Sequence, residues 1–205
     1  MLEVFLILLG YLMGSVPTGV LAARASGVDV RRVGSGNIGT ANVLRAAGKK
    51  AAFVTMLGDM AKGFAPVLIS VHLTPSTWVH AAVAFAALAG HTWPVFLRFK
   101  GGKGVATGAG TVIALAPLVG LFMFAVWWAV VLISRYTSLG AMVTMVLGPV
   151  AFILTGQPLP YVAYTVLGAA LVIWLHRENI RRLAAGTERK VGQRERLERS
   201  GERVR

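Results

Sequence analysis

The chain lacks cysteine and contains few acidic residues. The absence of cysteine excludes disulfide bonds, thiolate metal sites and thioester intermediates on the protein. Asp and Glu number 8 against 21 Lys and Arg, and charged residues make up only 14% of the 205 residues. Hydrophobic residues make up 56%, and the mean hydropathy is +0.67. This composition excludes an ordinary soluble globular domain and predicts a protein that resides in lipid.

The net charge of +13 is interpreted first as a topology signal, because basic residues of membrane proteins concentrate in cytoplasmic segments. No basic stripe with interleaved aromatic residues lies outside the hydrophobic segments, so nucleic acid is not expected as a partner. The basic C-terminal tail suits anionic lipid headgroups instead. Because Glu3 stands where a signal peptide has basic residues, the N-terminal segment predicts a retained transmembrane helix.

Long apolar segments predict an all-α integral membrane protein, since about 20 apolar residues cross the hydrocarbon core. The stretch 105–133 has two interpretations, one long tilted helix or a short hairpin hinged near Pro117 and Gly120. With the hairpin, the chain has seven transmembrane helices. These are 1–23, 51–73, 78–97, two within 105–134, 139–155 and 161–175.

The basic residues favour the hairpin. With seven crossings, every Lys and Arg except Lys62 falls on one side of the membrane, in 24–50, 98–104, 135–138 and the tail from His176. The positive-inside rule then places the N-terminus outside and the C-terminus in the cytoplasm, whereas a single helix would place the Arg-rich tail outside. We expect one membrane domain over residues 1–190 and a charged extension over 191–205.

The first cytoplasmic segment contains a glycine-rich motif, GSGNIGTAN at 34–42, followed by Arg45. Glycines allow the backbone to fold tightly and to aim N–H groups at an anion. The match to G-x-G-x-x-G does not indicate a dinucleotide site, because no strand precedes it, and the P-loop lysine is missing. A tight loop between helices is the alternative. The candidate phosphate-binding residues are Ser35, Gly36, Asn37, Gly39, Thr40 and Asn42.

The second cytoplasmic segment interleaves cations with glycines. Lys103 lies between Gly102 and Gly104, at the start of a predicted helix whose positive dipole end faces the same water. An ammonium group and exposed amides, with Gly101 included, could therefore reach one anion together. A generic positive-inside loop is the alternative, and it suffices for Arg98.

Two further pairs lie near these segments. Asp59 and Lys62 are three residues apart on one helix face, where they could neutralise each other and either orient the loops or bind substrate. His176 and Asn179 are three apart at a helix end and would project together towards the basic segments. The remaining histidines are expected to be interfacial or packing residues: His72, His80 and His91.

Together these segments resemble the bacterial acyl-phosphate:glycerol-3-phosphate acyltransferases, the PlsY family. The likeness runs from the first helix to about Lys190. The family usually has Ala then Thr where this chain has Thr40 then Ala41. The matching segments are GSGNIGTANVLR at 34–45, GHTWPVFLRFKGGKGVAT at 90–107 and HRENIRRLAAGTERK at 176–190.

The resemblance implies an enzyme that transfers a fatty acyl group from acyl phosphate to the 1-hydroxyl of glycerol 3-phosphate. The products would be lysophosphatidic acid and phosphate, the first step of phospholipid biosynthesis, at the cytoplasmic face of a bacterial inner membrane. By the family's pattern, Ser35, Asn37 and Asn42 would lead the contacts to acyl phosphate. Glycerol 3-phosphate or the developing charge would be held by Arg45, Lys103, Ser138, His176 and Asn179.

The histidines exclude a neighbouring class of acyltransferase. Enzymes that use thioesters of coenzyme A or acyl carrier protein commonly carry Asp five residues after His, and no His here has one. The motifs also lack a buried carboxylate–histidine pair, which suggests that a substrate phosphate assists deprotonation of the hydroxyl. No metal-ligand cluster is visible, so we expect no metal, no cofactor and no obligate protein partner besides membrane lipids.

Two rival functions remain open. A phosphate or organophosphate transporter could use glycine loops, an intramembrane ion pair and short broken helices. Its predicted outer face, however, has no charge to receive an anion, and no inverted repeat is visible. A basic scaffold that gathers anionic lipids is the other rival, although it would not require glycine to alternate with lysine.

Overall fold

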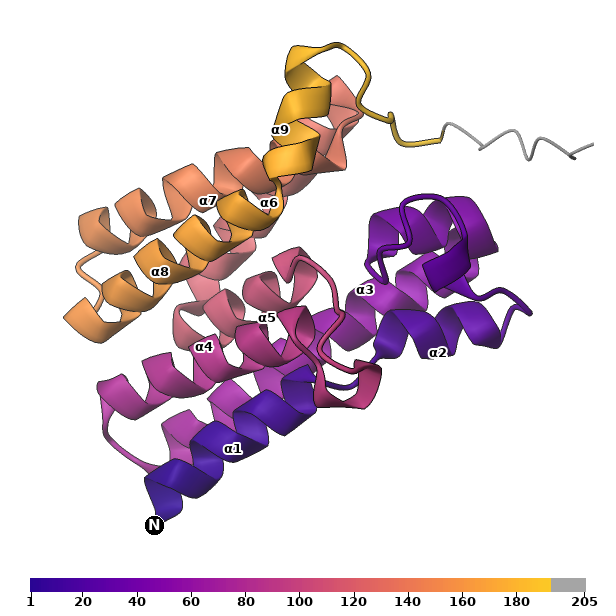
Figure 1. Cartoon of the computed structure of the whole chain (residues 1–205). Coiled ribbons are helices and arrows are strands. Elements are labelled where there is room, and N and C mark those ends of the chain that lie inside the picture. Colours follow the sequence, from indigo (N-terminus) through magenta and orange to yellow (C-terminus); the bar gives the residue numbers. More distant parts are fainter. Residues whose placement is uncertain (193–205) are drawn as a thin grey trace, which may run out of the picture.

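The computed structural model describes residues 1–192, and all its regular elements are helices (Figure 1). The all-α prediction is therefore confirmed for this part of the chain. Of the predicted charged extension 191–205, only the first two residues fall within the described range. The helices are α1 Leu2–Gly14, α2 Thr18–Arg24, α3 Thr40–Leu73, α4 Thr77–Thr92, α5 Val105–Leu115, α6 Pro117–Ser134, α7 Thr137–Leu154, α8 Leu159–Leu175 and α9 Arg177–Ala184, with 3₁₀ turns at Val30–Arg32 and Val95–Leu97.

Five helical segments among the described residues are long and apolar enough to cross a membrane. They are α1 with α2, α3, α4 with the following 3₁₀ turn, α6 and α7. The segment α8 reaches the required length only together with α9, which follows after a bend of 58°. The helix α5 is apolar but has only 11 residues. The chain thus has the build of a multi-pass membrane protein, while the count of seven crossings and the orientation stay predictions.

The first predicted helix, 1–23, is wrong as a continuous element. The structure breaks it between α1 and α2, where Pro17 supplies no N–H group to an intrahelical hydrogen bond. The ammonium group of Lys62 donates to the carbonyl oxygen of Val16 at 2.8 Å. The same carbonyl oxygen accepts from the Thr18 N–H group at 3.0 Å, so a buried cation from α3 and a local turn together satisfy a backbone group at the break.

The second predicted helix, 51–73, begins too late. Helical backbone already starts at Thr40, and it is interrupted at Gly48, whose φ of 85° lies in the left-handed region. Residues before the interruption form a short helix whose Val43 is buried with Val20 and Val30 in a small core beside α2.

The predicted hairpin at 105–134 is confirmed as two helices. Ala116 separates α5 from α6, and Pro117 is the first residue of α6. The N–H group at the first helical position makes no intrahelical hydrogen bond, so a proline there costs the helix nothing. Gly120 then lies so close to α5 that a Cβ atom there would come within 2.6 Å of the Ile113 Cα. A glycine at this position lets the two helices pack in direct backbone contact.

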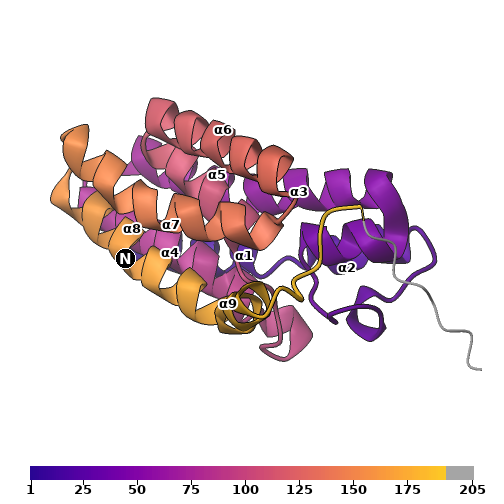
Figure 2. The same ribbon diagram turned by 90° about the horizontal axis from the view of Figure 1, so that it is seen from above.

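The helices pack so that all the motif segments reach one end of the molecule. The helix α3 packs on α5, α1 on α4, and α7 between α6 and α8, around buried residues such as Leu6, Val83 and Phe152. Figure 1 shows the N-terminus and the α3–α4 and α7–α8 turns at one end. The glycine-rich loop, the α4–α5 loop and α9 lie at the other end, as the view from above also shows (Figure 2).

Candidate active site

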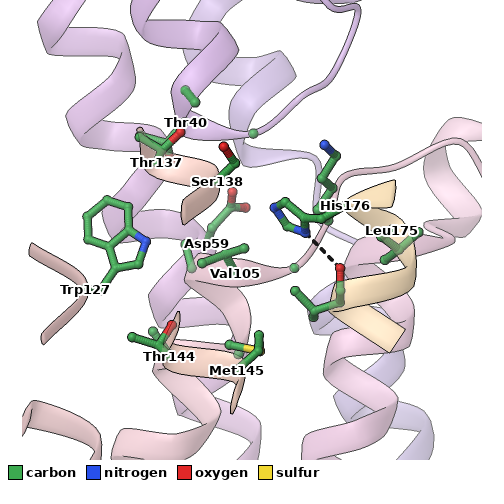
Figure 3. Close-up of a pocket in the computed structure, with 18 of the residues that line it drawn as sticks. Thr40, Asp59, Val105, Trp127, Thr137, Ser138, Thr144, Met145, Leu175 and His176 are labelled. Carbon is green, nitrogen blue, oxygen red and sulfur yellow. Dashed lines mark hydrogen bonds between the residues drawn. The ribbon is translucent and has the colours of Figure 1, made fainter. Parts of the chain in front are cut away.

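A pocket of about 640 Å³ lies where these segments meet (Figure 3). Its charged end is formed by the glycine-rich loop, the α4–α5 loop, α9 and the residues that follow α9. Most of the predicted site residues line it, but Gly36, Asn42, Lys62, Gly101 and Gly102 do not. The predicted residues that do line it are Ser35, Asn37, Gly39, Thr40, Arg45, Asp59, Lys103, Gly104, Ser138, His176 and Asn179.

The other walls of the pocket are apolar and come from α3, α5, α6, α7 and α8. Figure 3 shows Trp127 and Met145 on the walls away from Thr40 and Ser138. A pocket that joins an apolar wall to a cluster of cations fits a molecule with an alkyl chain and an anionic head. The apolar side chains of the walls include Met60, Val112, Met123, Phe124, Trp127, Val131, Met145 and Val172.

Asn42 shapes the glycine-rich loop from within. Its Nδ2 donates to the carbonyl oxygens of Val30, Val33 and Asn37 at 2.9 to 3.1 Å, and its Oδ1 accepts from the Ser35 N–H group at 3.1 Å. The side chain is thereby saturated, and only 2% of the residue is exposed. The prediction that Asn42 contacts substrate is therefore wrong in this structure. Asn42 instead fixes the position of Ser35 at the pocket wall.

The N-terminus of α3 faces the pocket. Gly39 is its N-cap, and the next N–H groups precede the first intrahelical hydrogen bonds of the helix. They place the positive end of the helix dipole at the charged end of the pocket, as a bound anion requires. The Thr40 hydroxyl is buried and has no hydrogen-bond partner among the described residues. The exchange of Thr40 and Ala41 relative to the family pattern therefore places a free hydroxyl at this wall.

The glycines of the α4–α5 loop have a different role from the predicted one. The N–H groups of Gly101 and Gly102 donate to the carbonyl oxygens of Thr92 and His91, each at 3.1 Å. They close the C-terminal end of α4 and are not directed at an anion, so their predicted phosphate contact is wrong. Gly102 lies against the imidazole of His91, where a side chain would not fit. This close packing presents Lys103 to the pocket.

Lys103 lies at the centre of the charged end. Its ammonium group donates to Oδ1 of Asn179, which brings the second and third motif segments into contact. Burial, together with the nearby Arg182, lowers the pKa of Lys103 to about 8. The ammonium group is therefore mostly protonated at neutral pH, but it is poised to lose its proton in mild base.

His176 is buried at the bend between α8 and α9, with 4% of its surface exposed. Its Nδ1 donates to the carbonyl oxygen of Val172 at 2.7 Å (Figure 3), so the neutral ring carries its lone pair on Nε2. Burial lowers the pKa of His176 to about 4. The ring is neutral at physiological pH, so any contribution of His176 to holding glycerol 3-phosphate or the developing charge would be made by a hydrogen bond and not by a positive charge. The neutral ring fits a hydrogen-bond acceptor for a hydroxyl.

Glu188 belongs to the third motif segment, but no role in the site was predicted for it from the sequence. Its Oε1 accepts from Ser138 Oγ at 2.7 Å and Asn179 Nδ2 at 2.6 Å, and its Oε2 accepts from Arg182 Nε at 2.7 Å. Burial raises the pKa of Glu188, but the hydrogen bonds from Asn179, Ser138 and Arg182 outweigh this effect and bring the pKa below its ordinary value. The only sequence signal was an acid within a basic segment.

Asp59 is the centre of a buried polar cluster at the pocket wall. Its Oδ1 lies 2.8 Å from Lys62 Nζ and 3.6 Å from His91 Nδ1, and it accepts a hydrogen bond from the Thr18 hydroxyl. Thr107 Oγ1 lies 3.0 Å from the same nitrogen of His91. The structure thus contains a buried carboxylate–histidine contact whose carboxylate, Asp59, lies outside the three motif segments. Asp59 Oδ1 is bound by Thr18 of α2 and by Lys62 of α3, which indicates that Asp59 joins helices.

No group of three or more His, Cys, Asp or Glu that could hold a metal ion occurs among residues 1–192. The cations that line the charged end are instead side chains of the protein. They are Arg45, Lys103, Arg177, Arg182 and Arg189.

Comparisons with known proteins agree with this geometry. The family model for glycerol-3-phosphate acyltransferase matches residues 4–186. A glycerol-3-phosphate acyltransferase of Rubrobacter xylanophilus is 71% identical over 94% of this chain and 96% of its own, and one of Thermus thermophilus is 49% identical over 93% and 96%.

Two solved structures have the same fold. They are those of PlsY (YgiH), an integral membrane glycerol 3-phosphate acyltransferase, in its glycerol 3-phosphate and lysophosphatidic acid forms. The glycerol 3-phosphate form is 41% identical, with a TM-score of 0.89, and the match covers 94% of this chain and 96% of that chain. The lysophosphatidic acid form is 40% identical, with a TM-score of 0.87, and the match covers 93% of this chain and 95% of that chain. The resemblance of the three motif segments is confirmed, and the chain belongs to the glycerol-3-phosphate acyltransferase family.

Proposed function

We propose that this enzyme transfers a fatty acyl group from acyl phosphate to the 1-hydroxyl of glycerol 3-phosphate at the cytoplasmic face of the inner membrane. The supporting observation is one pocket that joins an apolar wall to a cluster of cations. An acyl phosphate has an alkyl chain and a phosphate at opposite ends of a reactive carbonyl. A glycerol 3-phosphate molecule adds a second phosphate, which requires more positive charge than one anion would.

The phosphates are held by charge and backbone dipoles. The N-terminus of α3, with Ser35 and Thr40 beside it, supplies N–H groups and hydroxyls to the acyl phosphate. Lys103 and Arg45 lie at the same end of the pocket and neutralise the phosphate that leaves. Acyl phosphate is a mixed anhydride with a good leaving group, so orientation and cations suffice without a covalent intermediate.

The proton of the attacking hydroxyl passes to a phosphate of the substrates. Nε2 of His176 accepts a hydrogen bond from the hydroxyl and orients it, but a ring with a pKa of about 4 is a weak base. A phosphate with a second pKa of about 6 is the stronger base. The hydroxyl oxygen attacks the carbonyl carbon, the bond from that carbon to the phosphate oxygen breaks, and the products are the ester and hydrogen phosphate.

The assay gives purified enzyme acyl phosphate and glycerol 3-phosphate and measures phosphate and lysophosphatidic acid together. We expect both products in equal amounts, and a fall in turnover by roughly 10²-fold or more in Lys103→Ala and His176→Ala. Lys100→Ala is the matched control, because Lys100 is an exposed cation of the same loop. Unchanged turnover in both site variants would refute these roles.

The same assay decides the donor and the rival function. Acyl coenzyme A or acyl carrier protein should give no product in place of acyl phosphate, and efficient use of either would refute the donor. In sealed vesicles, uptake of labelled glycerol 3-phosphate without acylation would instead indicate a transporter.

A further inference from the structure

We propose that Glu188 is a positioning residue that fixes the orientation of Asn179 and, through it, the ammonium group of Lys103. This role rests on the proposed function, since it assigns to Glu188 the alignment of the catalytic cation. The three side chains form a relay in which each member has one allowed direction of hydrogen bonding. The relay joins the segment after α9 to the α4–α5 loop.

The chemistry of the three groups sets that direction. A carboxylate only accepts hydrogen bonds and an ammonium only donates them. Asn179 lies between them, so its Nδ2 must face Glu188 and its Oδ1 must face Lys103, as observed. With the amide reversed, its NH₂ group would oppose the ammonium and its oxygen would oppose the carboxylate. Glu188 therefore selects the amide orientation that holds Lys103.

Glu188 is itself held on both sides of the pocket mouth. Ser138 donates to it from α7 and Arg182 from α9. A little further along, the Val191 N–H group donates to the carbonyl oxygen of Arg135 at 2.7 Å, and Arg135 Nη2 donates to the Val191 carbonyl oxygen at 3.1 Å. The segment after α9 is thus anchored to the turn between α6 and α7. The carboxylate is a fixed point of reference, because only 6% of its side chain is exposed.

Glu188 also adjusts the charge balance at Lys103. The guanidinium groups of Arg182 and Arg177 from α9 and of Arg45 from α3 lower the pKa of Lys103, as burial does, whereas Glu188 raises it. The neighbouring His176 is neutral and adds no charge at physiological pH. Removal of the carboxylate would leave Arg182 without its ion-pair partner. The ammonium group would then lose its proton at a lower pH.

The experiment compares Glu188→Gln with Glu178→Gln over a range of pH. Both remove one negative charge near Lys103. Glu178, a residue of α9, also lines the pocket, but it is exposed and its carboxylate pairs with Arg181 at 2.9 Å instead of joining the relay. For Glu188→Gln we expect kcat to fall by about 10- to 100-fold from the misplaced ammonium, and the alkaline decline of activity to begin at lower pH. Glu178→Gln should keep the wild-type turnover and pH profile. Thermal denaturation is measured for every variant.

If Glu188 had only a structural role, Glu188→Gln would lower the melting temperature, but kcat per folded molecule would still fall over the same alkaline pH range as in the wild type. That result would overturn the proposal. Glu188→Asp keeps the charge one methylene further back, so it should lower kcat while the decline stays in place. Failure of both variants to fold would also overturn the positioning role. Absence of acyl transfer in the wild type would instead refute the proposed function, so the two failures are distinguishable.

Discussion

The amine of Lys103 is mostly protonated at neutral pH, although the positive charges of three nearby guanidinium groups lower its pKa. If it must be charged to stabilise the phosphate that leaves, activity is full below its pKa of about 8 and falls as pH rises through that value. We therefore expect an alkaline decline centred near pH 8 in steady-state kcat with acyl phosphate and glycerol 3-phosphate. His176 itself adds no decline until pH falls to about 4, because its ring acts in the neutral form. Any acid decline nearer pH 6 would come from protonation of the substrate phosphate that accepts the proton.

The variant Lys103→Arg provides the control for this pH dependence. A guanidinium stays charged throughout the accessible range, so the residual activity should lose its decline near pH 8 even though its rate is lower. The same decline in Lys103→Arg would show that another group titrates there.

At the scale of single residues, the sequence identifies polar side chains better than it identifies their roles. Ser35, Lys103 and Asn179 follow from motif chemistry, and the structure places all three at the pocket. Asn42 and Gly102 belong to the same motifs but bind other parts of the backbone, since the path of a loop is not encoded in its composition. Glu188 acts through partners that the fold alone brings together.

At the scale of elements, the break between α1 and α2 is in contact with a charge within the membrane-spanning part of α3. Lys62 Nζ lies 2.8 Å from both Asp59 Oδ1 and the Val16 carbonyl oxygen. Replacement of Lys62 by Met would remove the cation that neutralises the buried Asp59 carboxylate, which would keep only the hydrogen bond from the Thr18 hydroxyl and the contact with His91. We expect a loss of about 3–5 kcal/mol, or roughly 10 °C in the thermal denaturation of detergent-solubilised protein.

Two further variants define this effect. In the double variant Asp59→Asn with Lys62→Met, no unpaired charge remains, so much of the lost stability should return. Arg181→Met breaks an ion pair whose side chains are 75% and 55% exposed, so it should change the melting temperature little. A Lys62→Met protein as stable as the Arg181→Met protein would show that the pair does not hold the break.

Apolar length predicts which segments form helices, but not where they end or break. The hairpin at 105–134 was predictable because Pro117 begins a helix well and continues one poorly. The start of α3 at Thr40 was not, since charged residues between it and residue 51 resemble a loop. Those residues are helical because Val43 packs against α2, a contact that depends on the fold.

At the scale of the whole molecule, the distribution of basic residues predicts which end faces the cytoplasm. The pocket, the glycine-rich loop and α9 share the end that contains most of the cations, whereas the α3–α4 and α7–α8 turns at the other end contain none (Figure 1). The positive-inside rule then assigns the pocket to the cytoplasm, where soluble glycerol 3-phosphate is accessible.

The absence of native cysteine allows a direct test of this orientation. Ser26→Cys places a thiol in the exposed segment after α2, and Thr155→Cys places one at the exposed turn after α7. A maleimide that does not cross membranes should label Thr155→Cys in intact cells, and Ser26→Cys only after the membrane is permeabilised. The wild-type chain is the blank, and acyl transfer activity confirms that each variant is folded. The reverse labelling pattern would place the pocket outside the cell, away from cytoplasmic glycerol 3-phosphate, and would refute the predicted topology.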